Sequence, residues 1–238
     1  MKFVLTDEKS NIIAPLLKVN DINVIDINDL SKAFNISFNI NERKIIPHLI
    51  FSKNKSIIIG CPKEDLINIT EKLLLVLESL HQPINLILPQ HTLFSARNIN
   101  IINSTLFICL NKFTDSSTLK FLKSSLMERK DIIKEIIVIN ENRFLDEIIR
   151  DFPIKDNLFF ILKEDFDILL ITKKGETYIK ISKWLRKNNF KFIITNNNIN
   201  CLILGKIILS NQDINIEGYK LIKIKHEINF NALGFEIF

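Results

Sequence analysis

The feature that most constrains the fold is an alternation, along the whole chain, of short apolar runs with longer amphipathic stretches. The apolar runs have the length of buried strands, and the stretches between them carry apolar residues at helical spacing. At the start, residues 2–6 predict a strand, 9–19 a helix and 22–27 a second strand. Such a β-α-β unit implies parallel strands that are covered by helices.

The same alternation continues to the end of the chain. The further strands that it predicts are 56–59, 85–88, 105–110, 135–139, 157–162, 167–171, 190–194 and 219–224, with 199–209 as an apolar run of either type. The further helices that it predicts are 63–81, 115–130, 143–152 and 175–188. We therefore expect an α/β protein with eight or more strands, in one long sheet or in two smaller ones.

Composition excludes several classes of protein. The chain has 238 residues, of which 47% are hydrophobic and 25% charged, so it can bury a core and is not a disordered chain. The net charge of +5 comes mostly from lysines that are scattered along the sequence, which disfavours a nucleic-acid partner. It would equally suit a small polyanionic ligand.

Motifs for common cofactors and metals are missing. With only five glycines the sequence contains neither a dinucleotide-binding glycine motif nor a P-loop, so we expect no cofactor. Cys61, Cys109 and Cys201 stand singly and the four histidines are isolated, which predicts no metal site. We interpret Cys109 and Cys201 as small hydrophobic residues inside strands. No signal peptide or membrane span is visible, so we expect a cytoplasmic, monomeric protein without a membrane partner.

The candidate site lies in the short polar turns that follow the predicted strands. These turns are 6–10, 60–63, 172–175 and 195–198, and each precedes a stretch of helical pattern. Backbone amides at helix N-termini favour anions, and Lys63, Lys173 and Lys174 would add positive charge. The same turns could also be ordinary helix caps. We interpret the carboxylate pair Asp146-Glu147 as part of a solvated helix face and Trp184 as a core residue.

Taken in order, these pieces resemble the uroporphyrinogen-III synthase family. The strongest local likeness is the segment 167–174, which is similar to that family's strand ending in Phe-Thr-Ser-Pro. The segments 192–202 and 219–238 resemble the family's next strand unit and its closing strand with a short helix. The resemblance implies two smaller lobes, each a parallel sheet flanked by helices, joined by two crossing linkers. One lobe would comprise residues 1–32 and 143–238, and the other residues 33–142.

The resemblance also implies a function. It is the cofactor-free cyclisation of hydroxymethylbilane, a small polyanionic tetrapyrrole, with inversion of the last pyrrole ring. The substrate-binding residues that it implies are Thr6, Cys61, Lys63, Asn140, Thr172, Lys173, Lys174 and Asn198. Three alternatives remain open: a non-enzymatic binding or scaffolding protein of a bacterial assembly, a nucleic-acid-associated protein, and a different enzyme on the same architecture.

Overall fold

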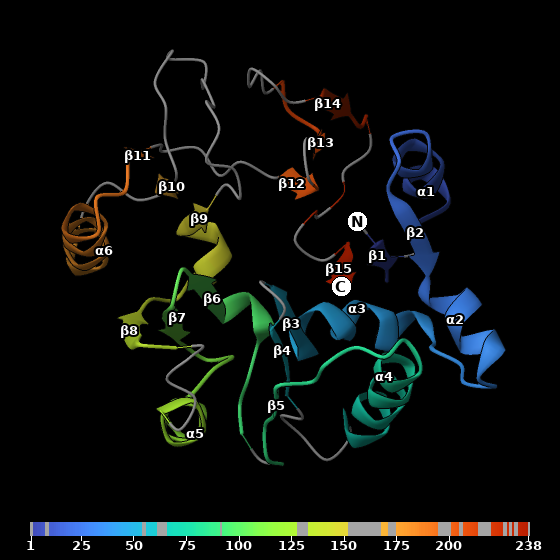
Figure 1. Cartoon of the computed structure of the whole chain (residues 1–238), viewed down its shortest axis with the longest axis horizontal. Helices are drawn as coiled ribbons and strands as arrows, with labels where there is room; N and C mark the ends of the chain where they lie inside the picture. The colour runs from blue at the N-terminus through green and yellow to red at the C-terminus, as the bar shows by residue number, and fades with distance from the viewer. Residues whose placement is uncertain are drawn as a thin grey trace.

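Five small sheets form a ring around a central axis (Figure 1). The computed structural model describes residues 2–7, 10–53, 56–60, 66–90, 92–127, 133–151, 168–170, 175–194, 201–204, 207–213, 220–225, 228, 230 and 233–237. Each sheet has three strands, and we call the sheets blades 1 to 5 in their order along the chain. The architecture is therefore α/β and propeller-like.

Every blade repeats one topology, in which a first strand pairs antiparallel with a second and the second pairs parallel with a third. The first strands of blades 1 to 5 are β15 (Gly234–Ile237), β3 (Ile50–Lys53), β6 (Ile99–Ile102), β9 (Ile149–Asp151) and β12 (Cys201–Leu204). The second strands are β1 (Lys2–Leu5), β4 (Ser56–Ile59), β7 (Thr105–Leu110), β10 (Ile168–Leu170) and β13 (Ile207–Ser210). The third strands are β2 (Asn23–Asp26), β5 (Leu86–Ile87), β8 (Glu135–Asn140), β11 (Phe192–Ile194) and β14 (Lys220–Lys223).

Helices make the parallel crossovers from second to third strands, as parallel pairing requires. These helices are α1 (Ser10–Lys18), α4 (Ile67–Ser79), α5 (Ser116–Met127) and α6 (Glu176–Lys187), and Figure 1 shows them on the outside of the ring. Other helical segments connect one blade to the next: α2 (Ile27–Ala33), α3 (Ile40–Leu49), η2 (Ala96–Asn98) and η3 (Leu145–Glu147).

The two ends of the chain close the ring within blade 1, where β15 pairs antiparallel with β1. Gly234 lies opposite Leu5 in this pair, and a Cβ atom at Gly234 would clash with the carbonyl oxygen of Val4. Only glycine allows the two strands to approach this closely.

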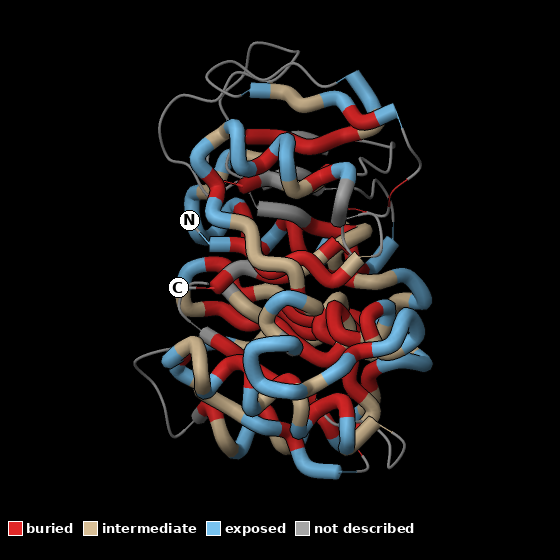
Figure 2. Tube along the Cα trace, turned by 90° about the vertical axis from the view of Figure 1, so that its right-hand side faces the viewer, coloured by how far each residue is buried: buried red, intermediate tan, exposed pale blue. Residues whose placement is uncertain are grey.

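The hydrophobic core is divided into clusters that lie between neighbouring blades. One cluster joins Phe107 of β7 in blade 3 to Ile149 of β9 and Trp184 of α6 in blade 4. Another joins Phe3 of β1 to Leu209 of β13, and so links blades 1 and 5. Figure 2 shows the buried residues concentrated inside the ring and the exposed ones in turns and helix faces. Each blade is therefore stabilised mainly by the apolar surface that it buries against its neighbours.

Several sequence expectations are confirmed. The class is α/β, and α1, α4, α5 and α6 lie within the predicted helices. Trp184 is 5% exposed, and Cys109 and Cys201 are buried in strands, as interpreted. Among the described residues, none of the helices combines the length and the apolar character that a bilayer crossing requires.

Other expectations are wrong. The expected parallel sheets are instead five mixed sheets, because the first strand of each blade runs antiparallel to the second. The expected helix 143–152 is a short 3-10 turn followed by β9, because Ile149 pairs with Leu170 of β10. The expected strand 157–162 lies outside the described residues. The division into residues 1–32 with 143–238 and 33–142 stays a prediction.

Candidate functional site

The segments that lead into blades 2, 3 and 4 contact one another next to the first strands, with α3 against η2 and η2 against η3. His48, Arg97 and Glu147 each stand two residues before the first residue of a first strand. The blade repeat therefore brings three residues that are far apart in sequence to equivalent positions at one end of the ring. We call the group that they form with their neighbours the axial cluster: His48, Ser95, Arg97, Phe144, Asp146 and Glu147.

Arg97 is the centre of the axial cluster. Its guanidinium donates from Nε to Asp146 Oδ2 at 2.8 Å, and from Nη2 to Asp146 Oδ1 at 3.1 Å and Glu147 Oε1 at 2.8 Å. It also lies over the ring of Phe144, with Cζ 3.9 Å from the ring centroid. The arginine side chain is only 10% exposed. Two carboxylates and an aromatic face are the groups that recognise a planar guanidinium.

The electrostatics of the cluster favour positive charge. Burial alone would lower the pKa of Arg97, but the hydrogen bonds and charges of Asp146 and Glu147 outweigh it and raise the pKa. Two carboxylates face one guanidinium, so one negative charge remains uncompensated within this group. An additional cation is therefore better accommodated here than an anion.

His48 is the titratable group of the cluster nearest to neutrality. Burial lowers the pKa of His48 below its ordinary value, and the positive charge of Arg97 lowers it further. Its Nδ1 lies 3.0 Å from the hydroxyl of Ser95, and its ring is 5.7 Å from that of Phe144. The imidazole is therefore neutral at neutral pH and can accept a proton.

A polar network fixes η2 and so positions Arg97. Asn98 is fully buried and donates from Nδ2 to Asn111 Oδ1 at 2.8 Å and to Thr114 Oγ1 at 2.9 Å. Asn111 in turn donates to the carbonyl oxygen of Arg143 at 3.1 Å. These bonds tie η2 to the end of β7 and to the segment before η3.

A second buried arginine serves the chain itself. Arg43 of α3 donates to the carbonyl oxygens of Thr6 and Asp7, each at 3.0 Å, and lies 3.8 Å from Asp26. Backbone carbonyls occupy its donors, so this arginine connects blade 1 to α3. It differs from Arg97, whose donors all point at side-chain carboxylates.

The residues that the sequence predicted for the site are only partly described. Thr6 follows β1 and is fully buried, with its hydroxyl donating to the carbonyl oxygen of Leu233 at 3.3 Å. Asn140 is the last residue of β8 and is exposed. The remaining six, Cys61, Lys63, Thr172, Lys173, Lys174 and Asn198, lie outside the described residues. Their roles stay predictions.

Thr6 and Asn140 share the end of the ring at which the axial cluster lies. Second strands run antiparallel to first strands, and third strands run parallel to second strands. Both therefore end where the first strands begin. The rule that ligands bind beyond the carboxyl ends of strands points to the end of the ring that carries the axial cluster.

The axial cluster itself was missed by sequence reasoning. The interpretation of Asp146-Glu147 as a solvated helix face is wrong, because both carboxylates hold Arg97 and are only about a quarter exposed, at 25% and 26%. The spacing of 49 residues between Arg97 and Asp146 carries no local signal. Only the blade-length repeat of a residue two positions before an apolar strand could have indicated it.

A metal or a free nucleophilic thiol finds no support in the described part of the chain. Those residues contain no group of three His, Cys, Asp or Glu side chains that could hold a metal ion. Burial raises the pKa of the Cys109 thiol to about 11, and its Sγ points at the carbonyl oxygens of Glu141 and Arg143. Cys109 is therefore protonated and inert at neutral pH.

Comparison with known proteins identifies the fold. No protein-family model matches the sequence, and no curated protein sequence matches it. The structure resembles a dimethylarginine dimethylaminohydrolase with a TM-score of 0.65 at 11% identity, over 100% of this chain and 99% of the other. The chain shares the propeller-like pentein fold.

Two other kinds of enzyme have the same arrangement. The N-terminal domain of the cyanobacterial arginine dihydrolase ArgZ, bound to product, matches with a TM-score of 0.59 at 9% identity, over 93% of this chain and 89% of that domain. SxtG, an amidinotransferase of saxitoxin biosynthesis from Microseira wollei, matches with a TM-score of 0.60 at 11% identity, over 94% and 77%. At these identities the likeness shows the fold alone.

These findings overturn the resemblance to uroporphyrinogen-III synthase and the tetrapyrrole function that it implied. The shared order of strands and helices misled the sequence comparison, because that order does not record which strands pair. The axial cluster also disfavours a polyanionic substrate, since it carries more carboxylates than cations.

Proposed function

We propose that this chain is an enzyme that binds a small guanidino compound of the arginine type at the axial cluster and hydrolyses its guanidino group. The observation that carries the proposal is the surroundings of the Arg97 guanidinium, which is held by Asp146 and Glu147 against the face of Phe144. The cluster is thus built to hold a planar cation. That the fold is shared with enzymes named for dimethylarginine, for arginine and for amidino transfer supports the proposed ligand class.

The cluster assigns roles to its members. Asp146 and Glu147 would hold the guanidinium of the ligand, and Phe144 would stack on its plane. Neutral His48 would take a proton from the attacking water and pass it to the departing amine. Hydrolysis adds water at the guanidino carbon, releases ammonia or an amine, and leaves a ureido group.

Arg97 limits access to this site. Its own guanidinium occupies the carboxylates, so a ligand has to displace it. A tethered competitor acts at an effective concentration on the order of millimolar, which weakens the binding of any free guanidino compound. We therefore propose that the wild-type chain binds such ligands weakly and that shortening Arg97 strengthens binding.

The test combines binding with product detection. Isothermal titration with L-arginine, agmatine and N-methylated arginine is carried out on the wild type and on Asp146→Asn, Glu147→Gln and Arg97→Ala. We expect the two carboxylate variants to lose about 10-fold in affinity and Arg97→Ala to gain about 10-fold, each equivalent to about 1.4 kcal/mol. Asp213→Asn is the matched control, because Asp213 is an exposed carboxylate paired with Lys223 in blade 5.

Mass spectrometry of the same mixtures looks for the ureido product, which is citrulline when arginine is the substrate. Product that requires His48 and both carboxylates supports the proposed hydrolase. Binding without product would refute hydrolysis and retain guanidino binding. Absence of both in wild type and in Arg97→Ala would refute the proposed function. The buried free thiols of Cys109 and Cys201 are consistent with the cytoplasm as the proposed compartment.

A further inference from the structure

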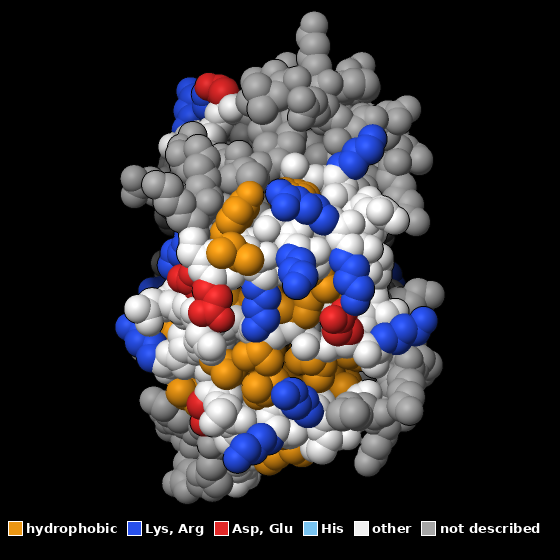
Figure 3. Space-filling view, turned by 90° about the vertical axis from the view of Figure 1, so that its left-hand side faces the viewer, with side chains coloured by type: hydrophobic (Ala, Val, Ile, Leu, Met, Phe, Trp, Pro, Cys, Tyr) orange, Lys and Arg blue, Asp and Glu red, His pale blue; other side chains and the backbone are white. Residues whose placement is uncertain are grey.

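A second surface lies on the outside of blades 3 and 4, away from the axial cluster. It consists of α6 and the neighbouring strand β8. One face of α6 buries Ile181, Trp184 and Leu185, which face the core between these blades. The opposite face exposes four basic side chains at helical spacing, Lys180, Lys183, Arg186 and Lys187. Figure 3 shows this side of the molecule, where basic side chains gather beside an apolar area.

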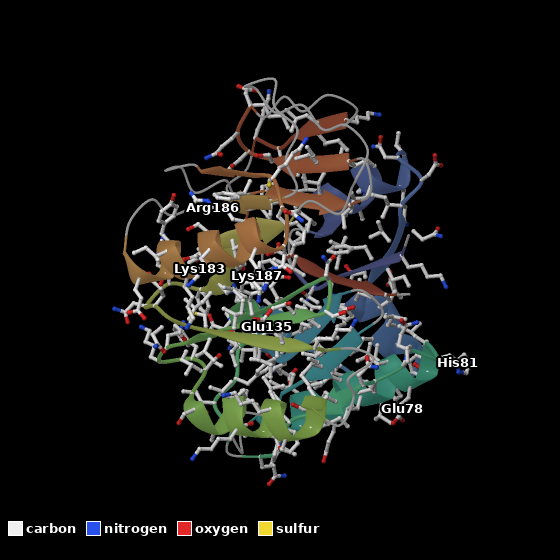
Figure 4. All side chains as sticks on the ribbon, turned by 60° about the vertical axis from the view of Figure 1, so that its left-hand side comes forward. Glu78, His81, Glu135, Lys183, Arg186 and Lys187 are labelled. Atoms are coloured by element: carbon white, nitrogen blue, oxygen red, sulfur yellow. The ribbon has the colours of Figure 1, made fainter. Side chains whose placement is uncertain are left out.

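The positive charge of this face is not neutralised by the helix itself. Within the described part of the chain, no ion pair is formed by Lys183, Arg186 or Lys187. The carboxylate of Glu135, at the start of β8, accepts a hydrogen bond from Trp184 Nε1 at 2.9 Å. Figure 4 shows the three basic residues along α6 with Glu135 on the strand beside it. The face therefore presents a row of cations with little opposing charge.

The strand next to this helix has an open edge. All six residues of β8, from Glu135 to Asn140, pair with β7, and among the described residues no strand pairs with the other edge of β8. The carbonyl oxygen of Val138 points to that outer edge, where it accepts a hydrogen bond from Lys180 Nζ. Backbone groups alternate along a strand, so the N–H of Val138 and the backbone groups of Ile136 also face outward. Such a row of groups is a template for another strand.

Apolar side chains lie between the basic row and the open edge. Ile179 of α6 is 62% exposed, and Ile136 and Val138 of β8 are half-buried. Exposed apolar surface next to an unpaired strand edge is a recurrent feature of sites that bind an extended peptide. The exposed apolar group is aliphatic, which suits a polypeptide better than the bases of a nucleic acid, which stack on aromatic rings.

We propose that this surface binds an acidic segment of a partner protein, which adds as a strand to the outer edge of β8. Its backbone would pair with Ile136 and Val138, and its apolar side chains would contact Ile179. Its carboxylates would face the basic row of α6 and take over Lys180 from the Val138 carbonyl. This binding would be independent of the guanidino site.

The test selects the partner's chemistry directly. A phage-displayed library of random ten-residue peptides is panned on the wild-type chain, and selected peptides are synthesised and measured by fluorescence anisotropy. We expect enrichment of sequences in which Asp or Glu alternates with Val or Ile. Two variants probe the two components: the double charge reversal Lys183→Glu with Arg186→Glu, and Val138→Pro. Proline at Val138 removes an outward N–H and leaves the ladder with β7 intact.

Each variant is expected to weaken binding at least about 10-fold, while the control reversal Lys18→Glu with Lys225→Glu, at exposed lysines elsewhere, changes it less than about twofold. Melting curves establish that the variants are folded, and Val138→Ala serves as the partner of Val138→Pro should the proline variant not fold. No enrichment, or peptides that bind the variants as tightly as the wild type, would overturn the proposal. Tighter binding of a 20-nucleotide oligonucleotide that is lost on charge reversal but kept in Val138→Pro would overturn it in favour of a nucleic-acid surface.

Discussion

Removal of the Arg97 side chain is the most direct probe of the axial cluster. Arg97→Ala deletes three charge-assisted hydrogen bonds, of 2.8, 3.1 and 2.8 Å, and the contact with Phe144. Breaking a fully buried ion pair typically costs about 3–5 kcal/mol, because the remaining charge stays unpaired. The two carboxylates are 25% and 26% exposed, so water partly replaces the arginine. We expect a loss of about 3 kcal/mol in the free energy of unfolding, a decrease of roughly 6–12 °C in the melting temperature.

Urea unfolding measures this loss. The chain has one tryptophan, Trp184, which lies in the core between blades 3 and 4 and so reports on the part of the ring that Arg97 stabilises. The control is Lys32→Ala, which removes an exposed pair with Asp29 on α2, with side chains 80% and 73% exposed, and is expected to cost less than about 0.5 kcal/mol. L-arginine at millimolar concentration should restore part of the stability of Arg97→Ala and none of that of the control. A loss below about 1 kcal/mol, with no effect of arginine, would refute the assignment of Arg97 as the buried guanidinium on which the cluster depends.

Three further predictions follow from individual contacts. Since the pKa of His48 is lowered in the folded state, its contribution to stability is complete above its unfolded pKa and is lost as the pH falls through the folded value; His48→Gln should therefore reduce the slope of melting temperature against pH on the acid side of about 6.5. Gly234→Ala should destabilise the closure of the ring by more than about 3 kcal/mol, measured by urea unfolding, because the added methyl group would clash with Val4; the same substitution at Gly175, which has no neighbour within 4 Å but a φ of +94°, should cost about 1 kcal/mol. With its pKa raised to about 11, Cys109 should react with a thiol reagent at pH 8 only after unfolding, and rapid labelling of Cys109 in the native chain, located by peptide mapping, would contradict its burial.

Local patterns predicted most of the helices and many strands. The spacing of Ile181, Trp184 and Leu185 places three apolar residues on one face, so α6 could be predicted from its own sequence. The apolar run 105–110 likewise predicted β7, which is buried in the middle of its blade. The run 199–209, which local pattern left undecided, contains the two antiparallel strands β12 and β13. Ile148 and Ile149 gave a helical spacing in the sequence, but the pairing of Ile149 with Leu170 of β10 made a strand.

The sequence by itself determined that this chain is an α/β protein, because apolar periodicity depends only on near neighbours. It also determined the burial of Trp184, Cys109 and Cys201, since a side chain within a strongly apolar run rarely has another place to go. Only the tertiary structure decided that the strands form five small mixed sheets in a ring, because a strand's partner and direction depend on contacts between distant residues. It alone brought Arg97 to Asp146 and Glu147, since those charges meet only when the segments entering neighbouring blades converge at one end of the ring.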